Sequence, residues 1–384
     1  MPELGECSPD RLRARTSEKW SAYEPGVLPA FIAEMDFDVA VPIRRAVSRA
    51  VEMSDFGYPH PTGLGDAFAR FAGSRWGWPV EPTRVHASAD VMTGVATMMA
   101  ALTPHGSGVV VNPPVYPPFF FRTEQTDRRV VTVPLAGRDL DLEGLDRALG
   151  DPGVSAYLLC SPHNPLGRVW SREELLAVAQ LCWRHEVLLL VDEIHAPLVL
   201  EGATFVPFAS LDHPMVERSV VFHSASKGWN IPGVKCGLIV AGSEKMSGVV
   251  NERWEALFPS HLGVVATEAA FAEESEPWLD EVLGQLDSNR QALRRLLPAA
   301  LPGVSYCEPE ASFLVWLDCS RLGLGDDPAA AFLEQGRVAL SSGLGFGDQG
   351  VGHARLNMGT SPQLLEEIVR RLALALPAGE TEVR

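Results

Sequence analysis

Residues 219–237 read SVVFHSASKGWNIPGVKCG, and this stretch decides how the rest of the chain is interpreted. A short apolar run, Val220–Phe222, predicts a buried strand, and small hydroxyl residues lead from it to Lys227. A turn with Gly and Pro follows, Lys235 stands eight positions after Lys227, and the apolar run Leu238–Ala241 predicts another strand. A lysine directly after a buried strand, among serines and glycines, can present its amine to an anionic ligand. The stretch alone is equally compatible with a surface lysine in a loop.

From Val85 onward, short apolar segments alternate with helical stretches, which is typical of βαβ units and a largely parallel sheet. The clearest helix runs to about His185 and begins with the capping box SREE at Ser171–Glu174. The pattern therefore predicts an α/β fold with a mostly parallel central sheet and helices on both of its faces. The predicted strands are Val109–Val111, Val130–Val133, Ala156–Cys160, Leu188–Val191, Val220–Phe222 and Leu238–Ala241.

The two ends of the chain follow other patterns. Residues 1–30 are polar and predict an irregular arm, and residues 31–37 (FIAEMDF) predict a short extended piece. Beyond Val250 the pattern becomes helical and then α+β. The predicted elements outside the central sheet are helices at Val41–Met53, Leu64–Trp76, Pro277–Leu297 and about Pro362–Ala375, and strands at Phe313–Leu317 and Ala354–Met358. We expect a large α/β domain at residues 41–275, and a smaller α+β domain formed by residues 276–384 with the arm at 1–40.

Composition restricts the function classes. The 384 residues have a formal net charge of −17, and no run of basic residues is longer than Arg128-Arg129 or Arg294-Arg295, which argues against nucleic acid as a partner. The six cysteines lack metal-finger spacing, so a reducing cytoplasm is the expected setting. The first residues have no apolar segment typical of a signal peptide, and no run of about 18 apolar residues occurs, so we expect neither a signal peptide nor a membrane span.

Polar residues follow several of the predicted strands. Tyr116 comes after the strand that ends at Val111, Asn164 after Cys160, Asp192 and His195 after Val191, and Ser224, Ser226 and Lys227 after Phe222. Each of them has a structural explanation when taken singly, such as a turn former, a helix cap or a packed ring. Taken together they lie at one edge of one parallel sheet, where ligands bind in such folds. We therefore interpret them as one site.

This set of groups matches pyridoxal phosphate (PLP). A lysine amine can bond covalently to the cofactor's aldehyde, and a buried aspartate can keep its pyridine nitrogen protonated. Hydroxyls, backbone amides and one cation can hold the phosphate, and an aromatic face can support the ring.

The motifs SASKGWNIPGVKCG (224–237), HNPLG (163–167) and DEIH (192–195) resemble those of the fold-type I, class I/II aminotransferase superfamily. Within it the chain is similar to the MalY/PatB branch of cystathionine β-lyases and cysteine-S-conjugate β-lyases. Further similarities extend over residues 31–358 and include AEMDF (33–37), PVYPPF (114–119) and RLN (355–357).

The resemblance implies a role for each candidate. Lys227 would hold PLP covalently and then move the substrate's α-proton, Asp192 would pair with the ring nitrogen, and Asn164 would donate to the phenolic oxygen. Tyr116 would stack on the ring, and Arg355 would clamp the substrate α-carboxylate. The remaining candidates, which would contact the cofactor and chiefly its phosphate, are His195, Ser224, Ser226, Lys235, Val91, Met92 and a neighbouring subunit's Tyr58. The last of these implies a homodimer with shared active sites.

Four positions depart from the usual pattern of this family. Asp90 stands where the phosphate-cradling turn usually has Gly, so the helix N-terminus must supply most of the grip unless the carboxylate points away. Glu34 replaces an Asp on the substrate side, and Leu166 replaces a Thr. Lys235 stands where many relatives have Arg, which turns a two-point grip into a point charge.

The implied activity is a C–S β-lyase that releases thiol, pyruvate and ammonia from cystathionine or another S-substituted L-cysteine. An aminotransferase is the alternative, because the same residues serve both outcomes of one carbanion. A cofactor-binding regulatory protein without activity is a third, which the joint presence of Lys227, Asp192, Asn164 and Arg355 disfavours.

Overall fold

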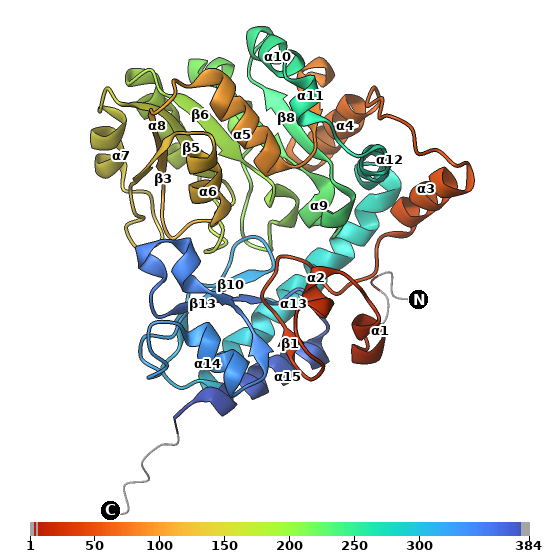
Figure 1. The fold of residues 1–384 in the computed structure, drawn as a ribbon, viewed down its shortest axis with the longest axis vertical. Coiled ribbons are helices and arrows are strands. Elements are labelled where there is room, and N and C mark those ends of the chain that lie inside the picture. Colours follow the sequence, from red (N-terminus) through yellow and green to blue (C-terminus); the bar gives the residue numbers. More distant parts are fainter. Residues whose placement is uncertain (1–3, 5–6, 378–384) are drawn as a thin grey trace, which may run out of the picture.

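The computed structural model describes residue 4 and residues 7–377, which form two lobes (Figure 1). The larger lobe contains a seven-stranded sheet in the order β2-β8-β7-β6-β5-β3-β4. Its strands are β2 (Val85–Ser88), β3 (Gly108–Val111), β4 (Arg129–Thr132), β5 (Val154–Cys160), β6 (Leu188–Asp192), β7 (Ser219–His223) and β8 (Gly237–Ala241). All of them are parallel except β8, which runs antiparallel to both β7 and β2. The expected α/β class with a mostly parallel central sheet is confirmed.

Helices cover both faces of this sheet (Figure 1). Val109 and Val111 pack with residues of α5, whereas Val110 between them belongs to the core of the opposite face. Because both faces are buried, the strands are continuous apolar runs without polar alternation, which is why the sequence revealed them. The helices of this lobe are α3 (Val41–Glu52), α4 (Leu64–Trp76), α5 (Val91–Leu102), α6 (Pro118–Gln125), α7 (Leu142–Leu149), α8 (Arg172–Arg184), α9 (Ala225–Gly228), α10 (Glu244–Asn251), α11 (Trp254–Leu257) and α12 (His261–Ala270).

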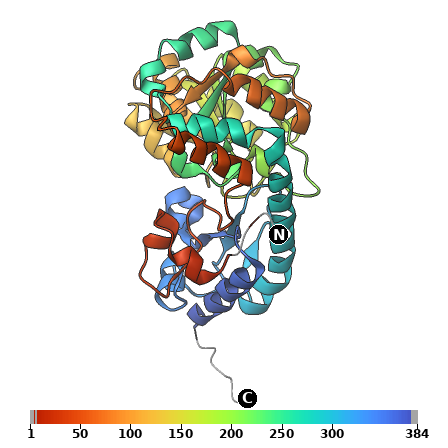
Figure 2. The ribbon, with the colours of Figure 1, turned by 90° about the vertical axis from the view of Figure 1, so that its right-hand side faces the viewer.

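The smaller lobe is built on a four-stranded antiparallel sheet in the order β12-β13-β10-β9. The long helix α13 (Glu276–Ala300) runs along the side of the molecule from one lobe to the other (Figure 2). The remaining elements are β9 (Ser305–Tyr306), β10 (Leu314–Asp318), α14 (Pro328–Glu334), β11 (Val338–Ala339), β12 (Ser341–Ser342), β13 (His353–Asn357) and α15 (Pro362–Leu372).

Two expectations need correction. The N-terminal arm is not wholly irregular: it contains α1 (Pro9–Arg13), α2 (Glu18–Ser21) and β1 (Leu28–Pro29), and β1 pairs in parallel with β11 of the smaller lobe. The strand β2 was missed because it is short and only half buried at the sheet edge. The capping box at the start of α8 is present, with Ser171 accepting from the Glu174 N–H.

Candidate active site

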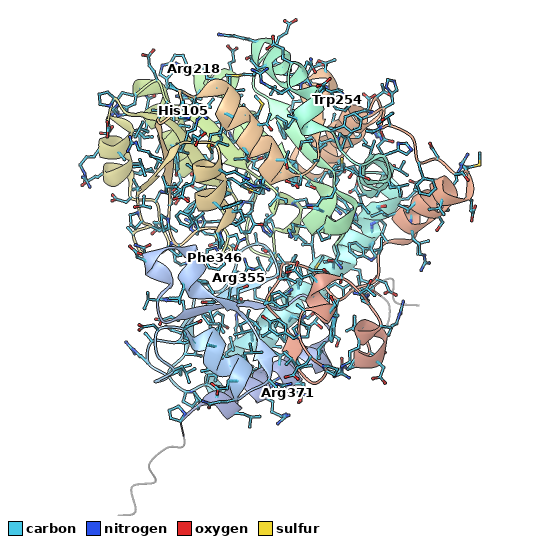
Figure 3. The ribbon with its side chains drawn as sticks, in the orientation of Figure 1. His105, Arg218, Trp254, Phe346, Arg355 and Arg371 are labelled. Atoms are coloured by element: carbon cyan, nitrogen blue, oxygen red, sulfur yellow. The ribbon has the colours of Figure 1, made fainter. Side chains whose placement is uncertain are left out.

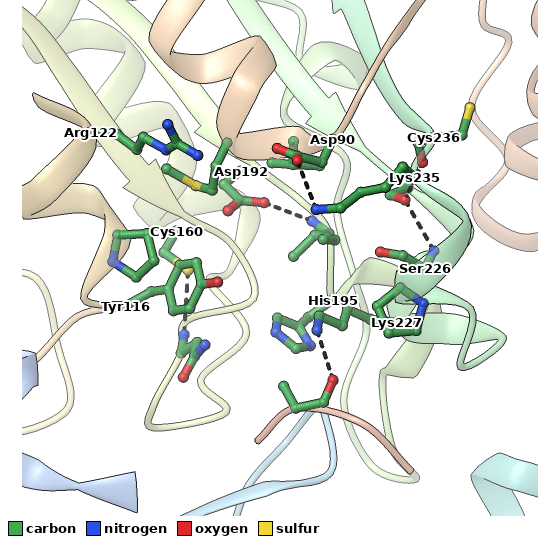
Figure 4. A pocket seen from close by; sticks show the side chains of 18 of the residues that line it. Asp90, Tyr116, Arg122, Cys160, Asp192, His195, Ser226, Lys227, Lys235 and Cys236 are labelled. Carbon is green, nitrogen blue, oxygen red and sulfur yellow. Dashed lines mark hydrogen bonds and ion pairs between the residues drawn. The ribbon is translucent and has the colours of Figure 1, made fainter. Parts of the chain in front are cut away.

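A cavity of about 410 Å³ lies where the parallel strands of the large sheet end (Figure 4). Its wall comes from the loops after β3, β5, β6 and β7, the first turn of α5, and the segment that contains Ala33. The structure thus brings together all of the candidate residues except Tyr58, with Arg355 just outside the lining, where it contacts Asn164. Those that line the cavity are Val91, Met92, Tyr116, Asn164, Asp192, His195, Ser224, Ser226, Lys227 and Lys235.

Lys227 is presented by α9, a single helical turn directly after β7. Ser224 begins this turn as its N-cap and accepts a hydrogen bond from the Ser226 N–H. The Lys227 Nζ donates to the Ala33 carbonyl at 2.7 Å. Burial, reinforced by the positive charge of Arg355, lowers the pKa of Lys227 to about 8. The neutral form of this amine, which a nucleophile or base requires, is therefore far more populated near neutral pH than that of an ordinary lysine.

Asp192 is the last residue of β6, with Cys160 and Phe222 as its partners on the neighbouring strands. It is 2% exposed, and burial raises the pKa of its carboxyl to about 7. One oxygen, Oδ1, accepts from the Ile194 N–H at 3.0 Å. A buried carboxyl that faces a cavity with a single such contact is suited to a cationic ligand atom, because the ion pair would offset its desolvation.

Asn164 and Arg355 form a pair between the two lobes. Arg355 lies on β13, and its Nη1 donates to the Asn164 Oδ1 at 3.0 Å. Since a guanidinium only donates, the Asn164 oxygen must face it, which leaves the Asn164 Nδ2 as a donor for a cavity ligand. Figure 3 shows Arg355 beside Phe346 where the lobes meet, and the guanidinium lies 5.1 Å from the Phe346 ring centre.

Arg355 is more constrained than a free carboxylate clamp. Its Nη2 donates to the Phe31 carbonyl and to the Ser341 hydroxyl, both at 3.0 Å, while the buried Nε has no partner among the described residues. A carboxylate that binds a guanidinium at two points accepts from Nη2 together with either Nη1 or Nε. Both Nη2 protons are already donated within the protein, so such a carboxylate must replace one of those contacts. The expected role of Arg355 thus requires a local rearrangement.

Tyr116 and His195 supply the rings of the cavity. Burial raises the pKa of the Tyr116 hydroxyl and lowers the pKa of His195 to about 3, so both side chains are neutral. His195 is 3% exposed and its Nδ1 has no partner within the described residues. Neutral rings here can support a flat ligand without competing for the Asp192 charge.

The anion end of the cavity is formed by the start of α5. The first N–H groups of a helix have no acceptor inside it, and Val91 and Met92 present theirs at the cavity wall. A Cβ on Gly237 would lie 2.7 Å from the Ser88 Oγ and 2.8 Å from the Val91 nitrogen, so only glycine lets β8 pass this turn so closely. Together with the Lys227 amine and the buried Asp192 carboxyl, this anion cradle fits PLP.

Asp90 does not obstruct this cradle. Its Oδ1 caps α5 by accepting from the Thr93 N–H at 2.8 Å, and its Oδ2 pairs with the Lys235 Nζ at 3.1 Å. The helix cap and Lys235 together hold the pKa of Asp90 below its usual value despite partial burial. The carboxylate is therefore occupied, and it offsets much of the Lys235 charge.

The two serines differ. The Ser224 hydroxyl donates to the Cys236 carbonyl at 2.8 Å, so its proton is already used within the protein. The Ser226 hydroxyl has no side-chain hydrogen bond to the described residues and remains available to an anion.

Of the other positions that depart from the family pattern, Glu34 accepts from the Ser17 hydroxyl at 2.7 Å, and Leu166 is buried in the core.

Tyr58 lies away from the cavity. Its side chain is 90% exposed and its ring contacts Phe258 edge-on, at 5.8 Å between ring centres. Within one subunit Tyr58 has no access to the site, so its expected role depends on a second copy.

Sequence analysis missed several cavity residues. Ala33 and Ile194 stand inside motifs that were recognised, but no role followed from their side chains. Arg122 and Phe121 project from α6, and the only available signal was that Pro118 suits a first helical turn after Tyr116. The cavity residues that were not predicted are Ala33, Pro118, Phe121, Arg122, Cys160, Ile194, Pro232 and Cys236.

Comparison with known proteins agrees with this geometry. The family model for aminotransferase class I and II matches residues 34–372. A Mycobacterium leprae protein provisionally named cystathionine beta-lyase is 43% identical over 97% of this chain and 98% of its own length. Cystathionine beta-lyase PatB of Bacillus subtilis is 36% identical over 91% of this chain and 92% of that protein. The crystal structure of a provisionally named PLP-dependent beta-cystathionase from Corynebacterium diphtheriae matches with a TM-score of 0.92 at 33% identity, covering 96% of this chain and 97% of that chain.

Proposed function

The chain belongs to the aminotransferase class I and II family, and from that premise we propose that it is a PLP-dependent carbon–sulfur β-lyase. Its substrate is cystathionine or another S-substituted L-cysteine. The observation that carries the proposal is the meeting of the Lys227 amine and the buried Asp192 carboxyl in one cavity, at the ends of adjacent strands. Relatives that bear the name cystathionine beta-lyase decide the reaction class.

Each cavity residue has a separate role toward the cofactor. PLP supplies an aldehyde that bonds to amines and a ring that accepts the electron pair left at the substrate Cα. Asp192 would hold the positive charge on the ring nitrogen, Asn164 would donate to the phenolic oxygen, and Tyr116 would support the ring face. The N-terminus of α5 and Ser226 would hold the phosphate, with Lys235 as a partly neutralised counter-charge.

Lys227 carries the proton. Its Nζ takes the Cα proton, and the Cβ–S bond then breaks so that its electron pair leaves on sulfur as a thiolate. Addition of water to the remaining three-carbon fragment gives pyruvate and ammonia, so substrate plus water balances thiol plus pyruvate plus ammonia. The pKa of about 8 suits Lys227 to both directions of proton transfer near neutral pH.

One assay tests the reaction. Purified protein loaded with PLP is incubated with cystathionine or an S-alkyl cysteine, without any keto acid, and pyruvate and free thiol are measured. We expect both products at equal rates. Turnover that requires an added keto acid would instead identify an aminotransferase.

A second experiment tests the attachment of the cofactor: borohydride reduction followed by peptide mass analysis should place it on Lys227. The exposed Lys245 of α10 provides a control, because Lys245→Ala should change neither result.

We further infer a homodimer that shares its active sites. Tyr58 is 90% exposed, and large apolar side chains nearby are also exposed, with Met53 at 71% and Phe56 at 62%. Such a group of side chains is unusual on a monomer surface and suits a subunit contact. Light scattering should give the mass of a dimer. Mixing inactive Tyr58→Ala and Lys227→Ala subunits should restore activity in hybrids if Tyr58 serves the neighbouring site. The six unpaired cysteines fit a cytoplasmic location.

A further inference from the structure

Residues 31–37 (FIAEMDF), here called the strap, belong to no helix or strand and bring Ala33 to the cavity wall. A backbone segment at such a place must still satisfy its N–H and C=O groups. Side chains from both lobes make most of these contacts, and the Asp36 N–H donates to the Gly359 carbonyl at 2.8 Å. The strap is therefore held by individual residues, and each of them can set its position.

Side chains of the smaller lobe and the arm bind strap carbonyls, and the Ser341 hydroxyl donates to the Phe31 carbonyl at 2.6 Å. Arg355 Nη2 donates to the Phe31 carbonyl at 3.0 Å. Asn357 Nδ2 donates to the Ile32 and Glu34 carbonyls, both at 2.7 Å. The buried Lys19 Nζ also donates to the Glu34 carbonyl, at 2.9 Å.

Two side chains of the larger lobe bind the other part of the strap. Lys227 Nζ donates to the Ala33 carbonyl at 2.7 Å. The Asn230 Oδ1 accepts from the Met35 N–H at 2.7 Å, and its Nδ2 donates to the Met35 carbonyl at 2.8 Å. Asn230 thus provides the donor and acceptor pair that a residue of an adjacent strand would provide.

The position of Asn230 in the chain couples the strap to the lysine. It follows α9 by two residues and has a φ of +56°, in the left-handed region, where Asn is favoured after Gly. The Ile231 N–H donates to the Ser226 carbonyl at 3.0 Å, which closes the turn around Lys227. The lysine and the amide therefore project from one compact turn toward Ala33 and Met35, which are two residues apart on the strap.

We propose that Asn230 is a positioning residue that fixes the strap so that the Ala33 carbonyl receives the Lys227 amine whenever that amine is not bonded to the cofactor. The inference rests on the proposed function, because it takes Lys227 as the reacting amine. The carbonyl accepts one Nζ proton and thereby orients the nitrogen toward the substrate side of the cavity. The ring of charges around Lys227 stays the same, since Asn230 carries none.

The test uses cofactor-free protein and two variants. Asn230→Gly removes the amide and keeps the left-handed backbone without strain, whereas Ala would add strain. Asn112→Ala is the control, because it removes two buried hydrogen bonds of the larger lobe, to Val133 and Tyr157, without touching the strap.

The first readout is amide hydrogen exchange of the strap. In the wild-type protein the Met35 amide should be protected, and Asn230→Gly should raise its exchange rate by about 10-fold or more, with Asn112→Ala unchanged. An unprotected Met35 amide in the wild-type protein would overturn the proposal without any variant.

The second readout is the pH profile of Lys227 modification by a small amine-directed reagent, followed by peptide mass analysis. A carbonyl acceptor stabilises the ammonium more than the neutral amine, so loosening the strap should lower the midpoint by about half to one pH unit. The charged or titratable groups that influence Lys227 are Arg355, Glu34, Asp192, Lys235 and His195, and all remain in each variant.

The outcomes separate the two proposals. If folded Asn230→Gly keeps the wild-type strap exchange and the wild-type Lys227 profile, the role of Asn230 is wrong while the lyase proposal stands. If borohydride fails to trap PLP on Lys227 of the wild-type protein, the lyase proposal is wrong whatever the exchange shows.

Discussion

The two walls of the cavity are built in different ways. The sheet wall consists of residues at the ends of parallel strands, such as Asn164, Asp192 and Lys227, and regular backbone hydrogen bonds place them. The opposite wall is the strap, which has no regular structure and is held by side chains such as Asn357 and Asn230. The sheet wall supplies the reacting groups on a rigid base, whereas the strap supplies a surface whose position depends on a few amides and charges. Substitutions should therefore act on chemistry at the first wall and on geometry or stability at the second.

The largest effect should come from the sheet wall. Lys227→Ala removes both the covalent attachment of PLP and the base for the Cα proton, so kcat/KM should fall by about 10³-fold or more. The melting temperature of the cofactor-free protein should change little, since Lys227 makes a single hydrogen bond. Steady-state kinetics and thermal unfolding check the two parts. Retention of a tenth of the activity would contradict the assignment.

The strap wall should show the larger loss of stability. Lys19 and Asp36 form an ion pair at 2.9 Å with both side chains 1% exposed, and Trp20 Nε1 also donates to Asp36. Lys19→Leu leaves the Asp36 charge buried without its partner, which should cost about 3–5 kcal/mol of unfolding free energy.

The matched control is the exposed Arg337–Glu24 pair at 2.8 Å. Removing it by Arg337→Ala should cost less than about 1 kcal/mol. Urea unfolding with equal slopes measures both variants. If the two variants lost similar amounts of unfolding free energy, burial of the Lys19–Asp36 ion pair would not make its loss more costly, and the prediction would be wrong.

The third effect is the pH dependence of Asp192. Its folded pKa of about 7 lies above the ordinary value of 3.8, so the folded cofactor-free protein retains a proton that the unfolded chain releases. Wild-type stability should therefore fall, relative to Asp192→Asn, as the pH rises from about 4 to about 7, and the difference should then stay constant. The pH-dependent change in the difference between the two free energies of unfolding should reach a few kcal/mol. Thermal unfolding of both proteins between pH 5 and pH 8 checks this, and a difference that shrinks with rising pH would contradict it.

The smallest effect concerns Asp90. Asparagine is an equally good helix cap, so Asp90→Asn should preserve stability while it frees Lys235 from its carboxylate partner. PLP should then bind about two- to five-fold more tightly in equilibrium dialysis at low salt, and the gain should shrink at high salt. Weaker binding would show that the carboxylate itself assists the anion cradle.

The sequence was informative wherever local chemistry and periodicity were strong. The central strands were apolar runs buried on both faces, and the start of α8 was marked by its capping box. It was uninformative where a structure depends on distant partners. The short elements α1, α2 and β1 lie in a polar arm, and nothing nearby in the sequence indicates that β1 pairs with β11. Arg122 was missed for a similar reason, since only the path of α6 brings it to the cavity.

The same division applies to the whole protein. The sequence by itself predicted the class of fold and singled out Lys227 and Asp192 as members of one site, because each stands at or shortly after the end of a strand and the ends of parallel strands share one edge. Only the tertiary structure decided which contacts those groups make. Asp90 pairs with Lys235, Arg355 is held by protein acceptors, and Asn230 grips Met35 across nearly two hundred residues of chain. Side-chain hydrogen bonds of this kind require segments far apart in sequence to be placed to within a few tenths of an ångström, and no local pattern encodes that placement.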